Sequence, residues 1–228
     1  MKIEAIVPAA GAGLRMGGGL RKQFLNLCGE PMFIHTLRRL AASPLIGRIV
    51  VAAPERQIAQ TREEVDRAGL PAPCSVVAGG ATRQESVANC FGHLDPSCDL
   101  VLVHDGVRPF VTMDLVGRVV EAASKTGAAT AACRARDTLK KTQDRRLTES
   151  ISRDTVVHIH TPQCFRYAIL AQALERAEVE GAQGSDESSL VLRLGMDVEV
   201  VDSPYWNIKV TTAEDMVLAE ALSMALLD

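Results

Sequence analysis

The chain opens with Ile3-Glu4-Ala5-Ile6-Val7-Pro8-Ala9-Ala10-Gly11-Ala12-Gly13-Leu14-Arg15-Met16-Gly17-Gly18-Gly19-Leu20-Arg21-Lys22-Gln23-Phe24, an apolar strand that runs directly into a glycine-rich loop. Glycines let a backbone come close to a ligand, and a row of free N–H groups forms an anion-binding nest. Arg15 and Lys22 add two positive charges beside that nest. The stretch predicts a polyphosphate site, and therefore nucleotide chemistry, at the end of the first strand.

Two common nucleotide loops do not match this stretch. The dinucleotide fingerprint G-x-G-x-x-G needs one residue fewer between its second and third glycines, and an acidic residue about 20 positions further on. A Walker loop needs a Gly-Lys-Ser/Thr end, which is absent from the sequence. A NAD-dependent dehydrogenase is therefore disfavoured. A plain strand-to-helix turn stays open as the structural alternative.

Composition limits the class of protein. The 228 residues are 47% hydrophobic and 23% charged, which fits one globular domain over 1–228. A net charge of −3 gives no basic field for nucleic acid. No apolar run approaches the roughly 18 residues of a membrane span, and no signal-peptide region precedes the first strand. Six scattered cysteines lack a C-x-x-C pair, which predicts reduced thiols in a cytoplasmic protein.

Strand and helix patterns alternate along the chain. Short β-branched runs predict strands at 3–7, 48–53, 74–78, 100–104, 128–133, 198–201 and 207–211. Helical patterns cover 31–42, 56–68, 82–92, 114–125, 167–180, 186–194 and the segment from 212 to the C-terminus. Pro31 suits a first helical position, and Thr82 and Glu85 form a capping box. The pattern predicts an α/β fold, with a mainly parallel, Rossmann-like sheet flanked by helices.

The alternation stops between residues 137 and 160. Segments 137–142 and 147–159 flank a polar turn and predict a β-hairpin with few apolar residues. A lone hairpin is marginal in water. We therefore expect a protruding β-arm that packs on another surface, with a second subunit as the natural candidate.

Further polar residues follow predicted strands. Ligands of open α/β sheets bind outside the carboxyl ends of the strands, where Asp105 lies. Asp105 can contact a ribose, hold Mg²⁺ or pair with Arg108 to lock its loop. His104 is expected to be a packed histidine. His158 and His160 share a strand face, but with no third ligand evident we interpret them as surface residues.

The glycine pair Gly79-Gly80 precedes a capped helix and can approach a flat base, with Ser86 as a donor, or can be a simple loop and cap. Lys209 stands near a strand end, where an exposed lysine is usually solvated.

Seven segments in register carry a resemblance. They are Pro8-Ala9-Ala10-Gly11-x-Gly13-x-Arg15-Met16, Lys22-Gln23-Phe24, Gly79-Gly80-x-x-Arg83-x-x-Ser86-Val87, His104-Asp105-Gly106-Val107-Arg108-Pro109, Arg136-Asp137-Thr138, Thr161-Pro162-Gln163 and Asn207-Ile208-Lys209-Val210-Thr211. In this order they resemble the 2-C-methyl-D-erythritol 4-phosphate cytidylyltransferases of the sugar-phosphate nucleotidyltransferases. The chain departs from the family pattern at Arg21, Ser185 and Trp206.

The resemblance implies a function. A homodimer would transfer CMP from CTP to 2-C-methyl-D-erythritol 4-phosphate, using Mg²⁺, and release pyrophosphate. The implied catalytic residues are Arg15, Lys22, Arg153 and Lys209. Asp105 would lie near the ribose, and its position at a strand end also makes it the candidate metal ligand. The implied binding residues are Pro8, Ala9, Ala10, Gly11, Ala12, Gly13, Gly79, Gly80, Arg83, Ser86, Asp105, Gly106, Arg108, Thr138, Thr161 and Ser185. In the family the arm, with Thr138 and Arg153, reaches the partner's site.

Two other functions stay open at this point. Ribitol-5-phosphate cytidylyltransferases share the chemistry and two of the segments. Trp206, which departs from the family pattern, stands next to the segment assigned to the acceptor, so the identity of the acceptor stays open. A nucleotide sensor without catalysis is the second alternative, although it has less need of both Arg15 and Lys22.

Overall fold

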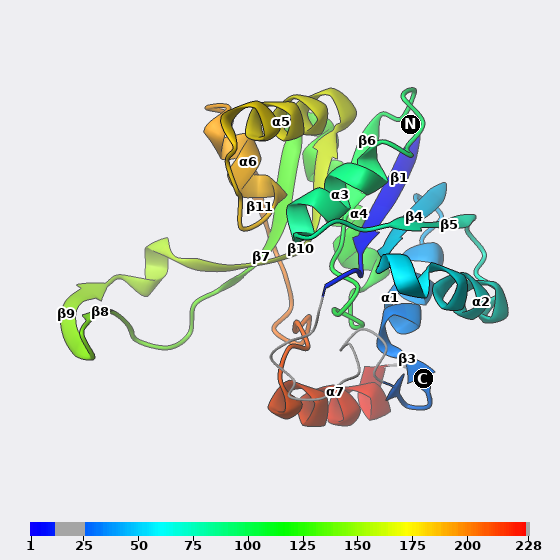
Figure 1. The fold of residues 1–228 in the computed structure, drawn as a ribbon. Helices are drawn as coiled ribbons and strands as arrows, with labels where there is room; N and C mark the ends of the chain where they lie inside the picture. Colours follow the sequence, from blue (N-terminus) through cyan, green and yellow to red (C-terminus); the bar gives the residue numbers. More distant parts are fainter. Residues whose placement is uncertain (12–25, 227–228) are drawn as a thin grey trace.

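A seven-stranded sheet forms the centre of the computed structural model, which describes residues 1–11 and 26–226. Its strands are β1 (Ile3–Pro8), β4 (Arg48–Ala53), β5 (Cys74–Ala78), β6 (Leu100–Val103), β7 (Ala128–Arg134), β10 (Val157–Arg166) and β11 (Glu199–Asp202). They are arranged in the order β11-β7-β10-β6-β1-β4-β5. Strand β10 runs antiparallel to β6 and β7, and the other pairings are parallel (Figure 1). The predicted α/β fold with a mainly parallel sheet is confirmed.

Helices cover both faces of this sheet (Figure 1). They are α1 (Met32–Ala41), α2 (Ile58–Ala68), α3 (Arg83–Phe91), α4 (Met113–Thr126), α5 (Tyr167–Glu180), α6 (Glu187–Arg193) and α7 (Ala213–Leu226). Along β1, Ala5 and Val7 belong to the core cluster under α1, α2 and α4, whereas Ile6 belongs to the cluster under α3, α5 and α6. Because alternate residues of a strand point to opposite faces, a continuous apolar run is what a sheet covered twice requires.

Helix starts follow the predicted caps with small differences. Pro31 is the residue before α1 and not its first residue. The Thr82 hydroxyl accepts the N–H of Glu85, as in a capping box, but the Glu85 carboxylate accepts the N–H of Ala81 in place of that of Thr82. Thr212 and Asp215 cap each other's backbone at α7.

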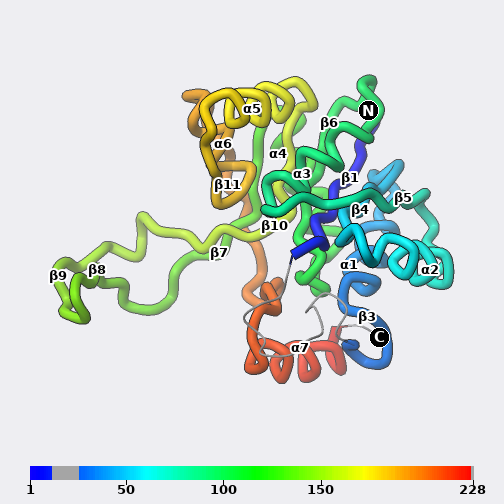
Figure 2. The backbone as a smooth tube through the Cα atoms, viewed as in Figure 1, coloured from blue at the N-terminus to red at the C-terminus, as the bar shows by residue number. Residues whose placement is uncertain are grey.

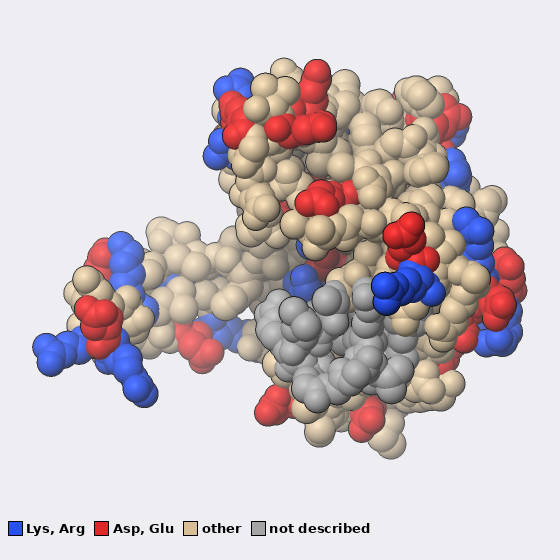
Figure 3. Space-filling model, viewed as in Figure 1, with Lys and Arg blue, Asp and Glu red and all other residues tan. Residues whose placement is uncertain are grey.

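The predicted β-arm is present and protrudes from the sheet. It pairs β8 (Leu139–Gln143) with β9 (Arg146–Ile151) through a two-residue turn, in which Asp144 and Arg145 both have positive φ. A turn of this kind matches the twist of the two strands. The backbone leaves β7, forms the arm and returns as β10 (Figure 2). Basic side chains gather at the tip of the arm (Figure 3).

Two predicted segments are wrong. The run 147–159 is not one strand: β9 ends at Ile151, a short 3-10 turn covers Arg153–Thr155, and β10 then enters the central sheet. The segment 207–211 is not a strand. Its backbone groups bond elsewhere, because the N–H of Val210 donates to the Val107 carbonyl and the N–H of Thr211 donates to the Asp215 carboxylate.

Two expectations about the whole chain can be compared with the structure. All six cysteines are unpaired thiols, in agreement with the predicted reduced state, and four of them are buried. None of the helices within 1–11 and 26–226 is long and apolar enough to cross a membrane.

Candidate active site

Three loops meet where β1, β5 and β6 end, and glycines let them touch. A Cβ on Gly79 would lie 2.2 Å from the Cβ of Ala10, far inside contact distance. A Cβ on Gly106 would lie 3.2 Å from the Cβ of Ala9. The loop after β1 is thus held between two glycine-bearing loops, at the edge of an α/β sheet where ligands bind.

Ser86 fixes the position of the Gly79-Gly80 pair through a hydrogen bond to its backbone. It is buried, its hydroxyl donates to the Thr82 carbonyl at 2.8 Å, and it accepts the N–H of Gly80 at 3.1 Å. The sequence suggested Ser86 as a donor to a base. In this arrangement its proton is given to the backbone, so Ser86 acts by positioning Gly80.

Asp105 lies at the centre of the site and contacts three cations. Its Oδ1 accepts Nε of Arg83 at 2.9 Å, and its Oδ2 lies 2.8 Å from Nζ of Lys209 and 3.7 Å from Nε of Arg108. Burial opposes the charge on Asp105, but the three cations hold the pKa of its carboxyl well below the usual range. The Asp105–Arg108 pair is therefore one part of a larger network.

His104 is a packed histidine, as expected, and it fixes this loop. Its Nε2 donates to the Arg108 carbonyl at 3.1 Å, which leaves Nδ1 to accept the hydroxyl of Thr161 at 3.0 Å. The Thr161 oxygen in turn accepts the N–H of Asp105. Burial lowers the pKa of His104 to about 4, so the ring is neutral at pH 7.

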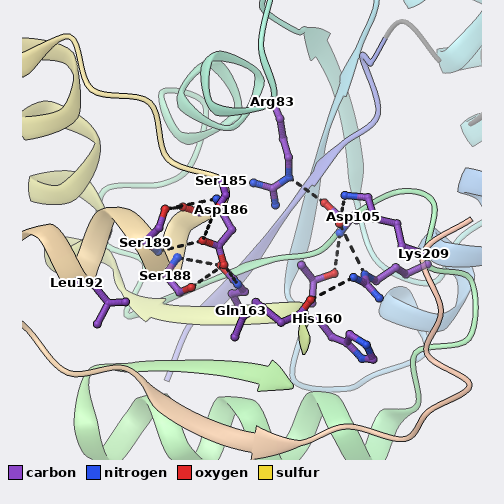
Figure 4. Close-up of a pocket in the computed structure, with 13 residues that line it drawn as sticks. Arg83, Asp105, His160, Gln163, Ser185, Asp186, Ser188, Ser189, Leu192 and Lys209 are labelled. Carbon is purple, nitrogen blue, oxygen red and sulfur yellow. Dashed lines mark hydrogen bonds and ion pairs between the residues drawn. The ribbon is translucent and has the colours of Figure 1, made fainter. Parts of the chain in front are cut away.

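A pocket of about 390 Å³ opens beside this network (Figure 4). It is lined by Arg83, Asp105, Arg108, Ile159, His160, Thr161, Gln163, Ser185, Asp186, Ser188, Ser189, Leu192 and Lys209. Six of these residues were predicted from the sequence: Arg83, Asp105, Arg108, Thr161, Ser185 and Lys209. The segments that position them are α3, the loop after β6, β10, the start of α6 and the loop before α7.

Other predicted residues lie elsewhere. Pro8 is the last residue of β1, and Ser86 lies in α3. The three neighbouring loops hold Ala9, Ala10, Gly11, Gly79, Gly80 and Gly106. Thr138 and Arg153 are exposed on the arm and do not line the pocket of their own chain. Ala12, Gly13, Arg15 and Lys22 lie outside the described residues.

Sequence reasoning missed Glu187, which is 1% exposed. Both of its carboxylate oxygens accept Nη1 of Arg83, at 2.7 and 2.9 Å. A signal was available: Leu190 and Val191 follow Glu187 at helical spacing, so this acid shares their buried face. Gln163 was also left without a role, although its side chain bonds Asp186 and the N–H of Ser188.

The described residues do not fit a metal ion held by protein. No group of three histidine, cysteine or acidic side chains converges anywhere in 1–11 and 26–226. Both oxygens of Asp105 already face cations. His158 is exposed, as interpreted from the sequence, but His160 is not a surface residue: it is partly buried, lines the pocket and is bonded through Nδ1 to the Ser203 hydroxyl. The suggestion that Asp105 holds Mg²⁺ gains no support from this geometry.

The fold and the site together define a class: a Rossmann-like α/β protein with a network of charged side chains outside the carboxyl ends of its strands, where such folds bind their ligands. The chain belongs to the family described as IspD, 2-C-methyl-D-erythritol 4-phosphate cytidylyltransferase, whose model matches residues 3–224. The activity of this family is the CTP-dependent cytidylylation of 2-C-methyl-D-erythritol 4-phosphate.

Relatives of that name are similar over almost the whole chain. The enzyme of Geobacter metallireducens is 44% identical over 225 residues, with 97% of each chain covered. That of Geotalea uraniireducens is 45% identical over 224 residues, covering 97% of this chain and 96% of the other. The crystal structure of the Thermus thermophilus cytidylyltransferase superposes with a TM-score of 0.80 at 33% identity, covering 98% of this chain and 100% of the other.

Proposed function

We propose that the pocket holds the sugar phosphate while CMP is transferred to it from CTP, giving 4-diphosphocytidyl-2-C-methyl-D-erythritol and pyrophosphate. The observation that carries this proposal is the charge balance around Asp105. Three cations (Arg83, Arg108 and Lys209) face two buried carboxylates (Asp105 and Glu187), so this network has one more positive than negative charge. The carboxylate of Asp186 lines the same pocket, but it is held by Gln163, Ser188 and Ser189 and not by these cations. A phosphate monoester supplies the missing negative charge.

Lys209 is the proposed main contact to the phosphate of the acceptor. Its side chain is 36% exposed, whereas that of Asp105 is 7% exposed. Lys209 is thus the cation of this pair that a ligand can reach. Thr161 and Ser185 line the same pocket and would help to position the sugar phosphate. Ser185 would contact the acceptor, whereas Thr161 would act by holding the Asp105 loop, because its hydroxyl is bonded to His104 and to the N–H of Asp105.

The nucleotide would lie on the adjoining loops. Ala9, Ala10 and Gly11, with Gly80, would surround CTP, and Asp105 would lie near the ribose. A phosphate oxygen of the acceptor attacks the α-phosphorus of CTP in line, the new P–O bond forms, and the bond to the leaving pyrophosphate breaks. No side-chain nucleophile is needed because the acceptor is already anionic. The protein's task is to position the reactants and to neutralise developing charge.

Arg15 and Lys22 are proposed for that second task, on the basis of the family motif alone. A guanidinium offers a planar fork and an ammonium a point charge, and both suit phosphoryl oxygens. Mg²⁺ enters the proposal as a companion of the triphosphate, since Mg²⁺ commonly binds substrate phosphates and water. No described residue is assigned to it, and no step above depends on it.

We also propose that the chain is one domain, acts as a homodimer in the cytoplasm, and uses the arm to reach the partner's pocket. Thr138 and Arg153 support this because they are exposed on an arm that projects away from the central sheet (Figure 1) and they do not line the pocket of their own chain. Arg153 makes one hydrogen bond through Nη1, to the Arg136 carbonyl, and so has further donors to offer.

Turnover of the two candidate acceptors, measured side by side with CTP, tests the proposal. We expect 2-C-methyl-D-erythritol 4-phosphate to be strongly preferred over ribitol 5-phosphate. In the same assay, Lys209→Ala should raise the KM for the acceptor far more than the KM for CTP. A preference for ribitol 5-phosphate would overturn the acceptor. CTP binding without release of pyrophosphate from either acceptor would favour a sensor.

A further inference from the structure

Arg83 makes only one of the two hydrogen bonds that a guanidinium usually makes to a carboxylate, here that of Asp105. A guanidinium usually grips a carboxylate with two parallel N–H donors. Here Nε donates to Oδ1 of Asp105, but Nη2 has no partner even though it is shielded from solvent. The second oxygen of Asp105 is turned to Lys209 instead (Figure 4).

Glu187 keeps Arg83 in this place. Its two oxygens hold Nη1, at the far side of the guanidinium, and the Glu187 side chain is 1% exposed. Arg83 is therefore fixed by α6 on one side and by the loop after β6 on the other. A buried N–H without a partner costs free energy, so the open position on Arg83 is a site where a second bond to Asp105 would be favourable.

We propose that Arg83 is a positioning residue that takes over the second oxygen of Asp105 when Lys209 turns to the phosphate of the acceptor. The inference rests on the proposed role of Lys209. In the structure Asp105 Oδ2 pairs with Lys209 at 2.8 Å, and Nε of Arg108 lies 3.7 Å away without a hydrogen bond. Transfer of Oδ2 to this Nε in place of Nη2 of Arg83 is the competing outcome, and a complex that shows it would overturn the proposal. When Oδ2 of Asp105 bonds to Nη2 of Arg83, a buried donor gains a partner. The negative charge of Asp105 also turns away from the incoming phosphate, which lowers the repulsion between them. Both effects lower the cost of releasing Lys209.

The variant Arg83→Lys tests this role of Arg83, because it keeps the positive charge but removes the pair of parallel N–H donors of the guanidinium. We expect the KM for 2-C-methyl-D-erythritol 4-phosphate to rise about tenfold, the size of one lost buried hydrogen bond, with a much smaller change in the KM for CTP. Arg48→Lys is the matched control. Arg48 also lies beside a buried carboxylate, that of Glu4 at 3.8 Å, but it is remote from the pocket. It should leave both KM values unchanged.

A double-mutant cycle with Lys209→Ala separates the two proposals. If Lys209→Ala does not raise the KM for the acceptor, the proposed function of the pocket fails. If it does, Arg83→Lys should add little in the Lys209→Ala background, because no lysine remains to be released. A further tenfold rise in that background, or equal losses for acceptor and CTP, would overturn the role of Arg83.

A crystal structure of the unmodified protein with 2-C-methyl-D-erythritol 4-phosphate decides the matter even if Arg83→Lys does not fold. We expect Nη2 of Arg83 within about 3.2 Å of Asp105 Oδ2, and Lys209 bonded to the phosphate and no longer to Asp105. An ammonium has three donors. A complex in which Lys209 bonds the phosphate and keeps Asp105 would therefore refute the proposal.

Discussion

Gly79→Ala is the sharpest test of how the three loops are held together. The added Cβ would lie 2.2 Å from the Cβ of Ala10 and 2.9 Å from Oγ of Ser86. Carbon atoms in contact lie about 3.5–4.0 Å apart, so one loop has to move by more than about 1 Å. Overpacking of this kind typically costs about 1–3 kcal/mol of stability. We expect a cost in the upper half of this range, because a Cβ is fixed to the backbone and cannot rotate away from the clash. For a chain of this length, about 2 kcal/mol lowers the Tm by roughly 4–8 °C.

The assay is thermal unfolding followed by circular dichroism, together with the KM for CTP. We expect a lower Tm and a raised KM for CTP, because the displaced loop is the one that would surround the nucleotide. Gly117→Ala, in α4, is the matched control: its Cβ meets nothing within 4 Å, and alanine favours a helix. Equal Tm values and equal KM values for the two variants would refute the steric argument.

The remaining predictions concern charge and assembly. Burial lowers the pKa of His104 to about 4, so between pH 6.5 and 4 the unfolded chain binds a proton that the folded chain does not bind. The free energy of unfolding should therefore decrease as the pH is lowered from 6.5 to 4. His104→Gln should remove about 3 kcal/mol of this dependence in urea titrations, and an unchanged slope would contradict it. Lys22→Ala should reduce turnover by orders of magnitude with less effect on CTP affinity, and near-normal turnover would exclude a catalytic role. Arg153→Ala should weaken binding of the acceptor far more than binding of CTP, and equal losses would mean that the arm is only structural. Sedimentation of the unaltered chain should give a dimer, and a monomer would contradict the arm as the dimer contact.

The strands that carry continuous apolar runs could be predicted from the sequence. The runs at 48–53 and 74–78 give β4 and β5 at the predicted bounds. Strand β4 is a central strand with a continuous buried apolar run, whereas β5 lies at the sheet edge with only Val76 buried and was predictable from its β-branched residues. Strand β10 was harder to predict, since its first residues are exposed at the root of the arm and only its second half is buried. No run of apolar residues marks where the arm ends and the sheet begins.

The sequence motifs predicted which residues belong to the candidate site, but not which side chains these residues pair with. Asp105, Lys209 and Arg83 stand in recognisable segments. Their mutual contacts depend on how distant segments fold together, as in the pairing of Arg83 with Glu187, 104 residues further on. Ser86 shows the reverse case: its type and position suggested a ligand, but its hydroxyl is used by the neighbouring backbone.

Strand β10 joins the arm to the pocket in a way that constrains how the sequence can vary. Val157 begins the strand at the root of the arm, and Thr161 lines the pocket four residues later, roughly 13 Å along the chain. The pairing of β10 with β7 shifts register between Ile159 and Gln163, and Ile159, His160, Thr161 and Gln163 all line the pocket. A one-residue insertion in this stretch would therefore displace pocket-lining side chains. The same insertion in the hairpin tip would leave the pocket intact. Length variation in this protein should therefore be tolerated at Asp144 and Arg145, and selected against between Val157 and Gln163.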